Sequence, residues 1–360
     1  DGAANFAADV TFADGADIIT ASAGTSNFRA GVNAGNSIAS GGNYNVVVGD
    51  EAGTAITTGD YNTAVGYEAG DAITTGVSNT FMGGRAGTAT TTASYNTAVG
   101  ERSFQTNTTG ANNVVMGWAA MTANTTGAEN TALGRSALAS NTTASNNTAV
   151  GYTALVANTT GTRNSAMGAT ALDANTEGNY NSAFGYNSLG ANTTGTHNTA
   201  LGDFSQAANT TGTKNVSVGQ GSFISNTTGS NNTVVGTEAL DQNTTASNNT
   251  AVGFQSLKAN TTGASNTAVG YSAVAANTTG IQNTSIGGFS LASNTTAAGN
   301  TAIGFGTLYT NTTGASNTAV GLNALNLSTT ASNNTAVGMS ALIANTTGDR
   351  NVAVGTEALD

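Results

Sequence analysis

The chain has 360 residues, a formal net charge of −11 at pH 7, and neither cysteine nor proline. The acidic balance argues against nucleic acid and anionic membranes as partners, because both present negative charge to a protein. The missing cysteines exclude disulfides and thiolate metal sites, and no apolar stretch is long enough to span a membrane.

Residues 1–44 differ from the rest and predict an N-terminal β cap or joint. Asp9 to Phe12 and Ile18 to Thr20 resemble two short strands around a turn. The segment Asn27 to Gly31 resembles a degenerate copy of the repeat that follows and predicts a first, partial coil. The opening residues lack the basic and apolar parts of a signal peptide, which fits either a removed leader or release by lysis.

From Asn45 onward a seventeen-residue unit recurs without insertion, in nineteen copies that begin at every seventeenth residue up to Asn351. Such a period is typical of a solenoid in which each unit forms one coil. Residues 45–360 are therefore predicted to form one all-β domain, a parallel β-solenoid. With strands about 4.8 Å apart, the stack would be a rod roughly 90 Å long. We number the positions of each unit 1 to 17, and Asn147 to Arg163 is a complete example.

Positions 1 to 5 predict a short strand that ends at an invariant glycine. Position 4 is always large and apolar, and we expect it to face the core. Position 9 is usually leucine and predicts a second inward contact. The Asn-Thr-Thr-Gly run at positions 12 to 15 predicts the other corner, with asparagine capping the backbone and glycine supplying a positive φ.

The repeats at residues 45–95 are variants of this pattern. Gly53, Gly70 and Gly87 replace leucine at position 9, and Ile56 and Ile73 replace asparagine at position 12. We therefore expect the cross-section to change near residues 95–105. The last repeat stops at position 10, so we expect either that the chain continues or that its open end stacks on something.

Each coil is thin, which predicts association. It holds about two large apolar side chains, each contributing roughly 1.5–3 kcal/mol when buried, against about 1–2 kcal/mol of backbone entropy per ordered residue. Asparagine and threonine ladders along the stack would help, and so would three chains packed around a shared axis. We expect a homotrimer with position 4, and also position 9, near that axis; a single-chain solenoid is the alternative. The predicted axis residues are Val65, Val99, Val150, Val252, Val269, Val320 and Val337.

Charged residues within the repeats mark the outward positions. They occupy positions 6, 7, 10, 16 and 17, apart from Glu177 at position 14. Position 6 also carries large rings, which we expect either to contact a receptor or to cover grooves and seams between chains. These candidate contact residues are Tyr67, Trp118, Tyr152, Tyr186, Phe254, Tyr271 and Phe305.

The sequence offers little support for catalysis. His197 is the only histidine and occupies a variable position, so neither a catalytic triad nor a histidine metal cluster is indicated. Gly219 to Gly221 and Gly304 to Gly306 resemble phosphate-loop fragments, but each begins at position 5 and lacks a strand-loop-helix context. We predict no enzyme activity, no cofactor and no metal. The many Asn-Thr-Thr triplets match glycosylation sequons but are explained by the turns.

The string Asn-Thr-Ala-Val-Gly-Tyr-Thr-Ala-Leu-Val-Ala-Asn-Thr-Thr-Gly at residues 147–161 resembles repeats of phage tail-fibre and fibre-like surface proteins. Positions 1 to 5 are also similar to the head repeats of trimeric autotransporter adhesins. This resemblance implies a trimeric, left-handed parallel β-roll exposed on a virion or outside the cell. The longer unit and the absence of a stalk, anchor and chaperone depart from those families.

These observations predict a structural fibre or adhesin that projects from a virion or cell surface and attaches to a host receptor or glycan. Its expected partners are its own copies, that receptor or glycan, and other fibre or virion proteins at its ends. The alternative is an ice- or crystal-binding solenoid, because threonines at positions 13 and 14 form two columns, although asparagine and charged residues flank them. A polysaccharide-cleaving fibre would need an acidic pair in a groove, and no repeat supplies one.

Overall fold

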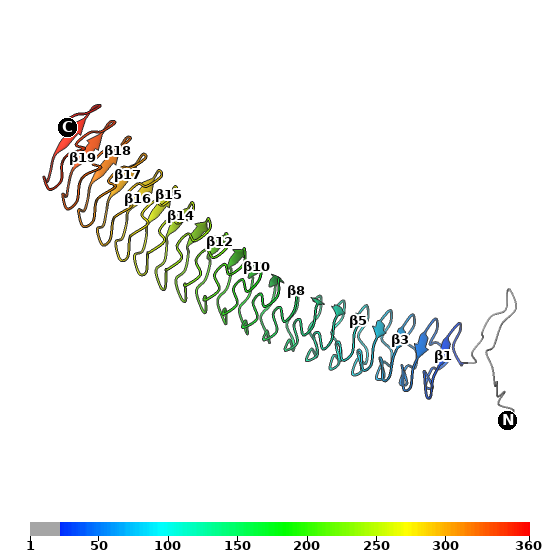
Figure 1. The fold of residues 1–360 in the computed structure, drawn as a ribbon. Coiled ribbons are helices and arrows are strands. Elements are labelled where there is room, and N and C mark those ends of the chain that lie inside the picture. The colour runs from blue at the N-terminus through cyan, green and yellow to red at the C-terminus, as the bar shows by residue number, and fades with distance from the viewer. Residues whose placement is uncertain (1–21) are drawn as a thin grey trace, which may run out of the picture.

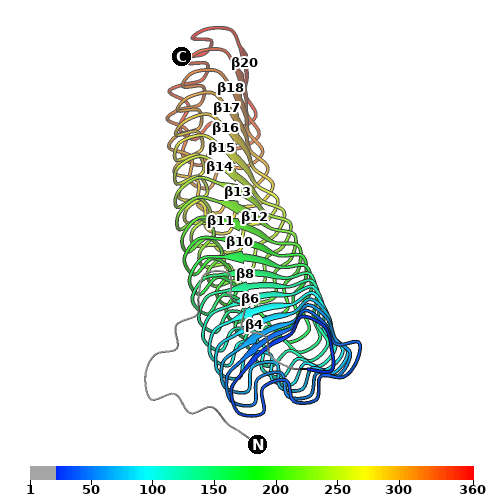
Figure 2. The ribbon, with the colours of Figure 1, turned by 90° about the vertical axis from the view of Figure 1, so that its right-hand side faces the viewer.

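The structure is a computed structural model that describes residues 22–360. The strands expected at Asp9 to Phe12 and Ile18 to Thr20 lie outside the described residues. The remainder is a curved rod of stacked coils (Figures 1 and 2). The predicted parallel β-solenoid with seventeen-residue coils is confirmed.

Within residues 22–360 there are twenty strands of three residues each, and they form one parallel sheet that runs along the rod. The strands are β1 (Phe28–Ala30), β2 (Val46–Val48), β3 (Thr63–Val65), β4 (Thr80–Met82), β5 (Thr97–Val99), β6 (Val114–Met116), β7 (Thr131–Leu133), β8 (Thr148–Val150), β9 (Ser165–Met167), β10 (Ser182–Phe184), β11 (Thr199–Leu201), β12 (Val216–Val218), β13 (Thr233–Val235), β14 (Thr250–Val252), β15 (Thr267–Val269), β16 (Thr284–Ile286), β17 (Thr301–Ile303), β18 (Thr318–Val320), β19 (Thr335–Val337) and β20 (Val352–Val354). Each strand pairs with the strand of the next coil, as Thr148 with Ser165. The segment at Asn27 forms the first coil, because Phe28 pairs with Val46.

Hydrogen bonds join neighbouring coils around the whole circumference. Beyond the strands, the Thr153 N–H donates to the carbonyl of Arg135 at 3.0 Å, and the Leu155 N–H donates to Ala171 at 3.0 Å. At the far corner the Thr159 N–H donates to the carbonyl of Thr176, also at 3.0 Å. Most of the turn backbone is thus paired between coils, as buried peptide groups require.

The glycine at position 5 is required by both conformation and space. Its φ lies between +129° and +146° in all nineteen repeats, a region that L side chains rarely adopt. A Cβ on Gly151 would lie 2.4 Å from the carbonyl oxygen of Gly168 in the next coil. The expectation that the position 15 glycine supplies a positive φ is wrong. The positive φ values of the repeats fall at positions 5, 7, 9 and 17. Five coils carry alanine at position 15, so glycine is not required there.

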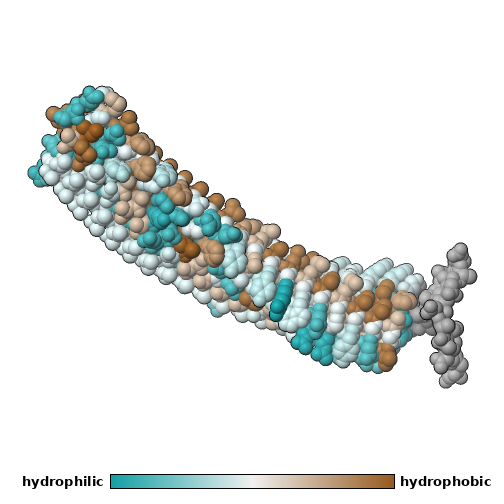
Figure 3. All heavy atoms as spheres, viewed as in Figure 1, coloured by the Kyte–Doolittle hydropathy of each residue, from teal (hydrophilic) through white to brown (hydrophobic). Residues whose placement is uncertain are grey.

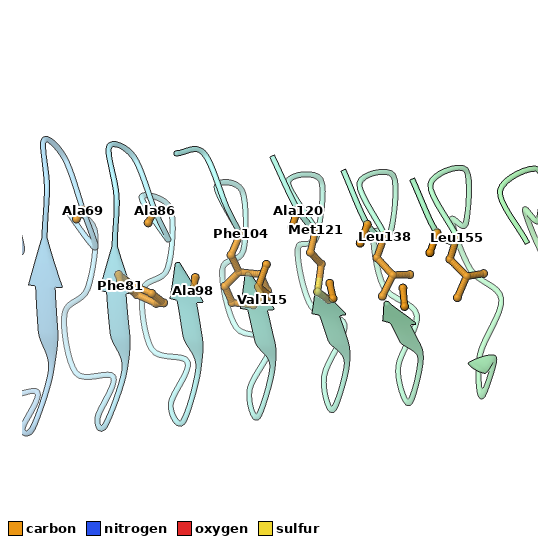
Figure 4. Packing of buried hydrophobic residues seen from close by; sticks show 14 of the residues in the cluster. Ala69, Phe81, Ala86, Ala98, Phe104, Val115, Ala120, Met121, Leu138 and Leu155 are labelled. Carbon is orange, nitrogen blue, oxygen red and sulfur yellow. The ribbon is translucent and has the colours of Figure 1, made fainter. Parts of the chain in front are cut away.

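The side chains inside the coil belong to position 3, so the expectation that position 4 faces the coil interior is wrong. Ala149 is fully buried, whereas Val150 is only half-buried on the outer face of the sheet. Alternate residues of a strand point to opposite faces. The interior is already filled from the opposite wall by position 9, such as Leu155 (Figure 4), so a small residue fits at position 3 and the larger one points outward.

In the first repeats the core is filled by different side chains along the same backbone path. The buried Ile56, Ile73 and Phe81 occupy the space that leucine fills later. A Cβ on Gly87 would lie 2.7 Å from the Phe81 ring. The inter-coil bond from Gly70 N–H to Ala86 matches the one from Leu155, so the change near residues 95–105 is one of packing rather than of backbone path.

Two columns of buried asparagine run along the stack. At position 1, the side-chain oxygen of Asn147 accepts from the Asn164 N–H at 2.9 Å, and its amide donates to the carbonyl of Gly161 at 2.9 Å. At position 12, the Asn158 amide donates to Asn141 at 3.1 Å and to Gly161 at 2.9 Å. The expected asparagine ladders are therefore present, and threonine adds a third column at position 13 through hydroxyl-to-carbonyl bonds.

Candidate surface-contact site

The outer turn of each coil, positions 6 to 11, presents the predicted contact residues. The backbone leaves the strand at the position 5 glycine and turns, so that position 6 points into solvent. All seven predicted rings are exposed, with exposed fractions from 42% for Phe254 to 56% for Phe305. Each ring lies one or more coils from the next. Six of the seven fall into three groups, and the seventh, Tyr186, meets Phe204 of the next coil edge-on with ring centres 5.2 Å apart.

The first group combines an aromatic ring with charges. Arg85 Nε donates to Glu68 Oε2 at 2.8 Å, and the Arg85 guanidinium lies 5.6 Å from the centre of the Tyr67 ring. Hydrogen bonding with Tyr67, reinforced by Arg85, lowers the pKa of Glu68. A hollow of about 180 Å³ adjoins Tyr67 and Arg85 and is completed by Gly84, Glu101 and Arg102.

In the second group an arginine lies between two of the predicted rings. The Arg135 guanidinium is 5.1 Å from the ring centre of Trp118 and 5.8 Å from that of Tyr152. An exposed cation–π contact of this kind contributes about 0.5–1 kcal/mol. The group therefore presents a layered surface, whose two rings remain largely accessible.

The third group is a continuous aromatic patch. The rings of Phe254 and Tyr271 stack with centres 5.7 Å apart, and Tyr271 meets Phe289 edge-on at 4.9 Å. Phe289 in turn contacts Phe305 and Tyr309. Sequence reasoning missed Phe289 at position 7 and Tyr309 at position 10 because it followed rings at position 6 alone. The signal was available, since positions 7 and 10 had been assigned to the outside.

A further set of rings lies at position 17, on a different corner of the coil. Tyr44 and Tyr61 stack with centres 4.9 Å apart, and Tyr180 stacks on His197 at 4.8 Å. The single histidine therefore contacts a tyrosine at the surface. Residues 22–360 contain no group of three or more histidine, cysteine or acidic residues that could hold a metal ion.

The predicted axis residues lie on the outer face of the sheet. Six of them are half-buried and Val337 is exposed. Position 4 of other repeats carries larger side chains, each with an exposed fraction above two fifths. These are Met82, Met116, Met167, Leu201 and Ile286. No charged residue occupies position 2 or 4 in any repeat, and apolar side chains recur along the edge of the rod that carries the strands (Figure 3).

Comparison with known proteins adds no family assignment. No protein-family model matches the chain, and no curated protein matches its sequence. In the part of the chain that the structure describes, no helix is both long enough and apolar enough to cross a membrane.

Proposed function

We propose that the protein is a structural fibre with adhesive function, exposed on a virion or cell surface and attached to a host receptor or glycan through its outer turns. The observation that carries this proposal is the contrast between the interior and the turns. Positions 1, 3, 5, 9 and 12 repeat because they fill the core or join the coils, while position 6 varies from aspartate to tryptophan on an exposed surface.

Aromatic side chains suit such a contact surface. They offer a large area of contact while losing little conformational entropy, and they dominate the energetics of many interfaces. Because the rod repeats these rings from coil to coil, one rod can make several weak contacts with the same surface. Such contacts strengthen one another through multivalency.

We also propose that three copies associate in parallel through the outer sheet face, as a left-handed β-roll. The supporting observation is an uncharged face along the rod on which several large apolar side chains, such as Met116 and Leu201, are exposed. Contiguous apolar patches larger than a few hundred Å² are rare on monomers and usually mark interfaces. The same face on another copy of the chain has the same length and the same spacing between coils. A symmetric homo-oligomer can therefore pack these faces together in register.

The adhesive function is tested by changing Trp118, Tyr152 and Tyr186 together to serine. We expect the far-ultraviolet circular dichroism and the sedimentation of the rod to stay unchanged. Binding to host cells or glycan-coated surfaces should weaken about tenfold or more, the usual effect of removing central aromatic contacts.

The matched control changes the exposed position 17 tyrosines Tyr61, Tyr95 and Tyr180 to serine. Equal loss of binding in both variants would show a non-specific effect. Unchanged binding in the position 6 variant, or loss of its assembly, would assign those rings to structure.

The ice-binding alternative receives less support from the geometry. The position 13 hydroxyls donate to carbonyls of the next coil, as Thr159 Oγ1 does to Thr176 at 3.1 Å. Only the position 14 column remains fully exposed, so the two-column array is incomplete. An ice-recrystallisation assay separates the two functions, and we expect no inhibition.

A further inference from the structure

The aromatic patch near the C-terminal end of the rod encloses a hollow that is larger than the one beside Tyr67. Its volume is about 330 Å³, and it is lined by Phe289, Phe305, Gly306, Tyr309, Asn323 and Asn326. These residues come from three successive coils. The volume lies at the small end of the range for small-molecule sites, about 300–1,000 Å³.

Rings form the walls of this hollow. The Phe289 ring is nearly perpendicular to that of Phe305, at 85° with centres 5.9 Å apart, and to that of Tyr309, at 75° and 6.3 Å. Phe305 and Tyr309 are both exposed, by 56% and 41%. Both rings are thus accessible from solvent beside the half-buried ring of Phe289.

Gly306 opens the hollow. It occupies position 7, where most coils carry a side chain, and its φ is +63°. A Cβ there would lie 2.6 Å from Asn323 Oδ1. Any larger side chain at this position would occupy the space between the rings and the amides.

Two side-chain amides supply the polar groups. Asn326 Nδ2 donates to the carbonyl of Gly306 at 2.7 Å, which fixes the orientation of that amide. Its Oδ1 and the Nδ2 of Asn323 have no hydrogen-bond partner among residues 22–360. One acceptor and one donor therefore remain available beside the aromatic walls.

The surroundings carry no charge. Between Lys258 and Asp349 the chain has no acidic, basic or histidine residue. A phosphate or carboxylate ligand would find no counter-charge within the coils that form the hollow. A neutral ligand needs no counter-charge, because its hydroxyl groups require only hydrogen-bond partners when they leave water.

We infer that this hollow binds a neutral pyranose unit of a surface glycan. The apolar face of the sugar ring packs on Phe305 and Tyr309, and its hydroxyl groups bond to Asn323 and Asn326. The inference rests on the proposed adhesive function, for which it names the ligand class and one binding site. It also places that site partly on residues outside position 6.

The test measures binding of the full chain to purified hexasaccharides by calorimetry and saturation-transfer NMR. The neutral probes are cellohexaose, maltohexaose, mannohexaose and chitohexaose, and the acidic probe is hexagalacturonate. Gly306→Asn fills the hollow without removing a ring, and asparagine is accommodated at position 7 with positive φ in Asn187 and Asn323. Gly221→Asn is the matched control, at the same position with φ of +61° and nothing within 4 Å of its Cβ.

We expect at least one neutral hexasaccharide to bind, and its affinity to fall about tenfold or more in Gly306→Asn and in Phe305→Ala. Gly221→Asn should bind like the parent. Undiminished binding in Gly306→Asn, or preference for hexagalacturonate, overturns the inference.

Adhesion to host cells, measured in parallel, separates this inference from the proposed function. If cells bind the parent and no hexasaccharide does, the pyranose site is wrong and adhesion stands, with a protein receptor as the remaining ligand class. If cells do not bind but a neutral hexasaccharide binds at this hollow, the site stands and the adhesive function fails.

Discussion

Single asparagines explain much of how so thin a coil is held in place. From Asn124 to Asn311, each position 12 amide donates to the asparagine seventeen residues earlier at 2.7–3.2 Å. The side chains are buried, so each bond satisfies groups that would otherwise cost about 1–3 kcal/mol. The interior is stabilised by repeated amide pairing as well as by leucine.

The ladder is interrupted at Ser328, which occupies position 12 in place of asparagine. Asn311 Oδ1 and Ser328 Oγ are buried there without a partner in residues 22–360. Ser328→Asn should restore two links and stabilise the local coils by about 1–3 kcal/mol. Amide hydrogen exchange in residues 311–345 should then slow by roughly 5- to 150-fold. Ser316→Asn, at an exposed position 17, is the control; equal protection in both variants would refute the explanation.

Three acidic groups at position 10, Asp71, Asp173 and Asp241, have pKa values raised first of all by burial, which disfavours their charged forms in the folded state. Burial raises the pKa of Asp173 above its ordinary value, although backbone hydrogen bonds oppose this. Because the folded pKa exceeds the unfolded one, the protonated form favours folding, and stability is lost as pH rises through the folded pKa.

Asp173→Asn should therefore raise the melting temperature at pH 7 and have little effect near about pH 3, where the carboxyl is protonated in both states. Thermal melts at both pH values check this. Asp50→Asn, at an exposed position 6, is the control. A gain of the same size at both pH values would contradict the proposed cause.

At the scale of the strand, the sequence predicted the pairing but not which face is buried. A period of two is consistent with either face inward, and the large residue at position 4 suggested the wrong one. The deciding feature is the width of the coil, which the strand pattern alone does not reveal. Leu155 already fills the interior from the opposite wall, so Ala149 must face it. The aromatic patch escaped prediction for a similar reason, since Phe289 and Tyr309 adjoin Phe305 only once the coils are stacked.

The hydrophobic core of the stack is divided at one coil. One cluster of buried apolar residues ends at Ala200 and the next begins at Phe223. Between them Gln206 occupies position 9, where its Nε2 donates to Thr199 at 2.9 Å and its buried Oε1 has no partner within the described chain. The buried serines Ser205 and Ser222 extend the polar break.

Gln206→Leu should remove the unpaired oxygen and join the two clusters. We expect a stabilisation of about 1–3 kcal/mol, from the lost desolvation penalty and the apolar surface gained. Urea unfolding followed by circular dichroism measures it, and a single sharper transition should replace any early loss of structure at this coil. Gln220→Leu, exposed at position 6, is the control, and a destabilised Gln206→Leu would show that the polar break has a structural role.

At the scale of the whole molecule, the exposed face of the sheet is the feature that a single rod does not explain. The interior is complete without position 4, yet every repeat carries a large apolar residue there. Within one rod a strand-forming polar residue such as threonine would also fit at this outward position. The uniform choice of apolar side chains is explained if the face is covered by other copies along its length.

This assembly predicts that charges on the two faces of one strand act differently. Val252→Asp with Val269→Asp places charges on the outer face, whereas Ala251→Asp with Ala268→Asp places them inside the coil. In a trimer the first pair buries unpaired carboxylates near the axis, at several kcal/mol each. We expect analytical ultracentrifugation to show three chains for the parent and a smaller species for this variant that retains the circular dichroism of the solenoid. The inward pair should abolish the solenoid signal itself, because the coil has no room or partner for a carboxylate. A parent that sediments as one chain, or an outward variant that keeps the mass and melting temperature of the parent, would rule out the shared axis.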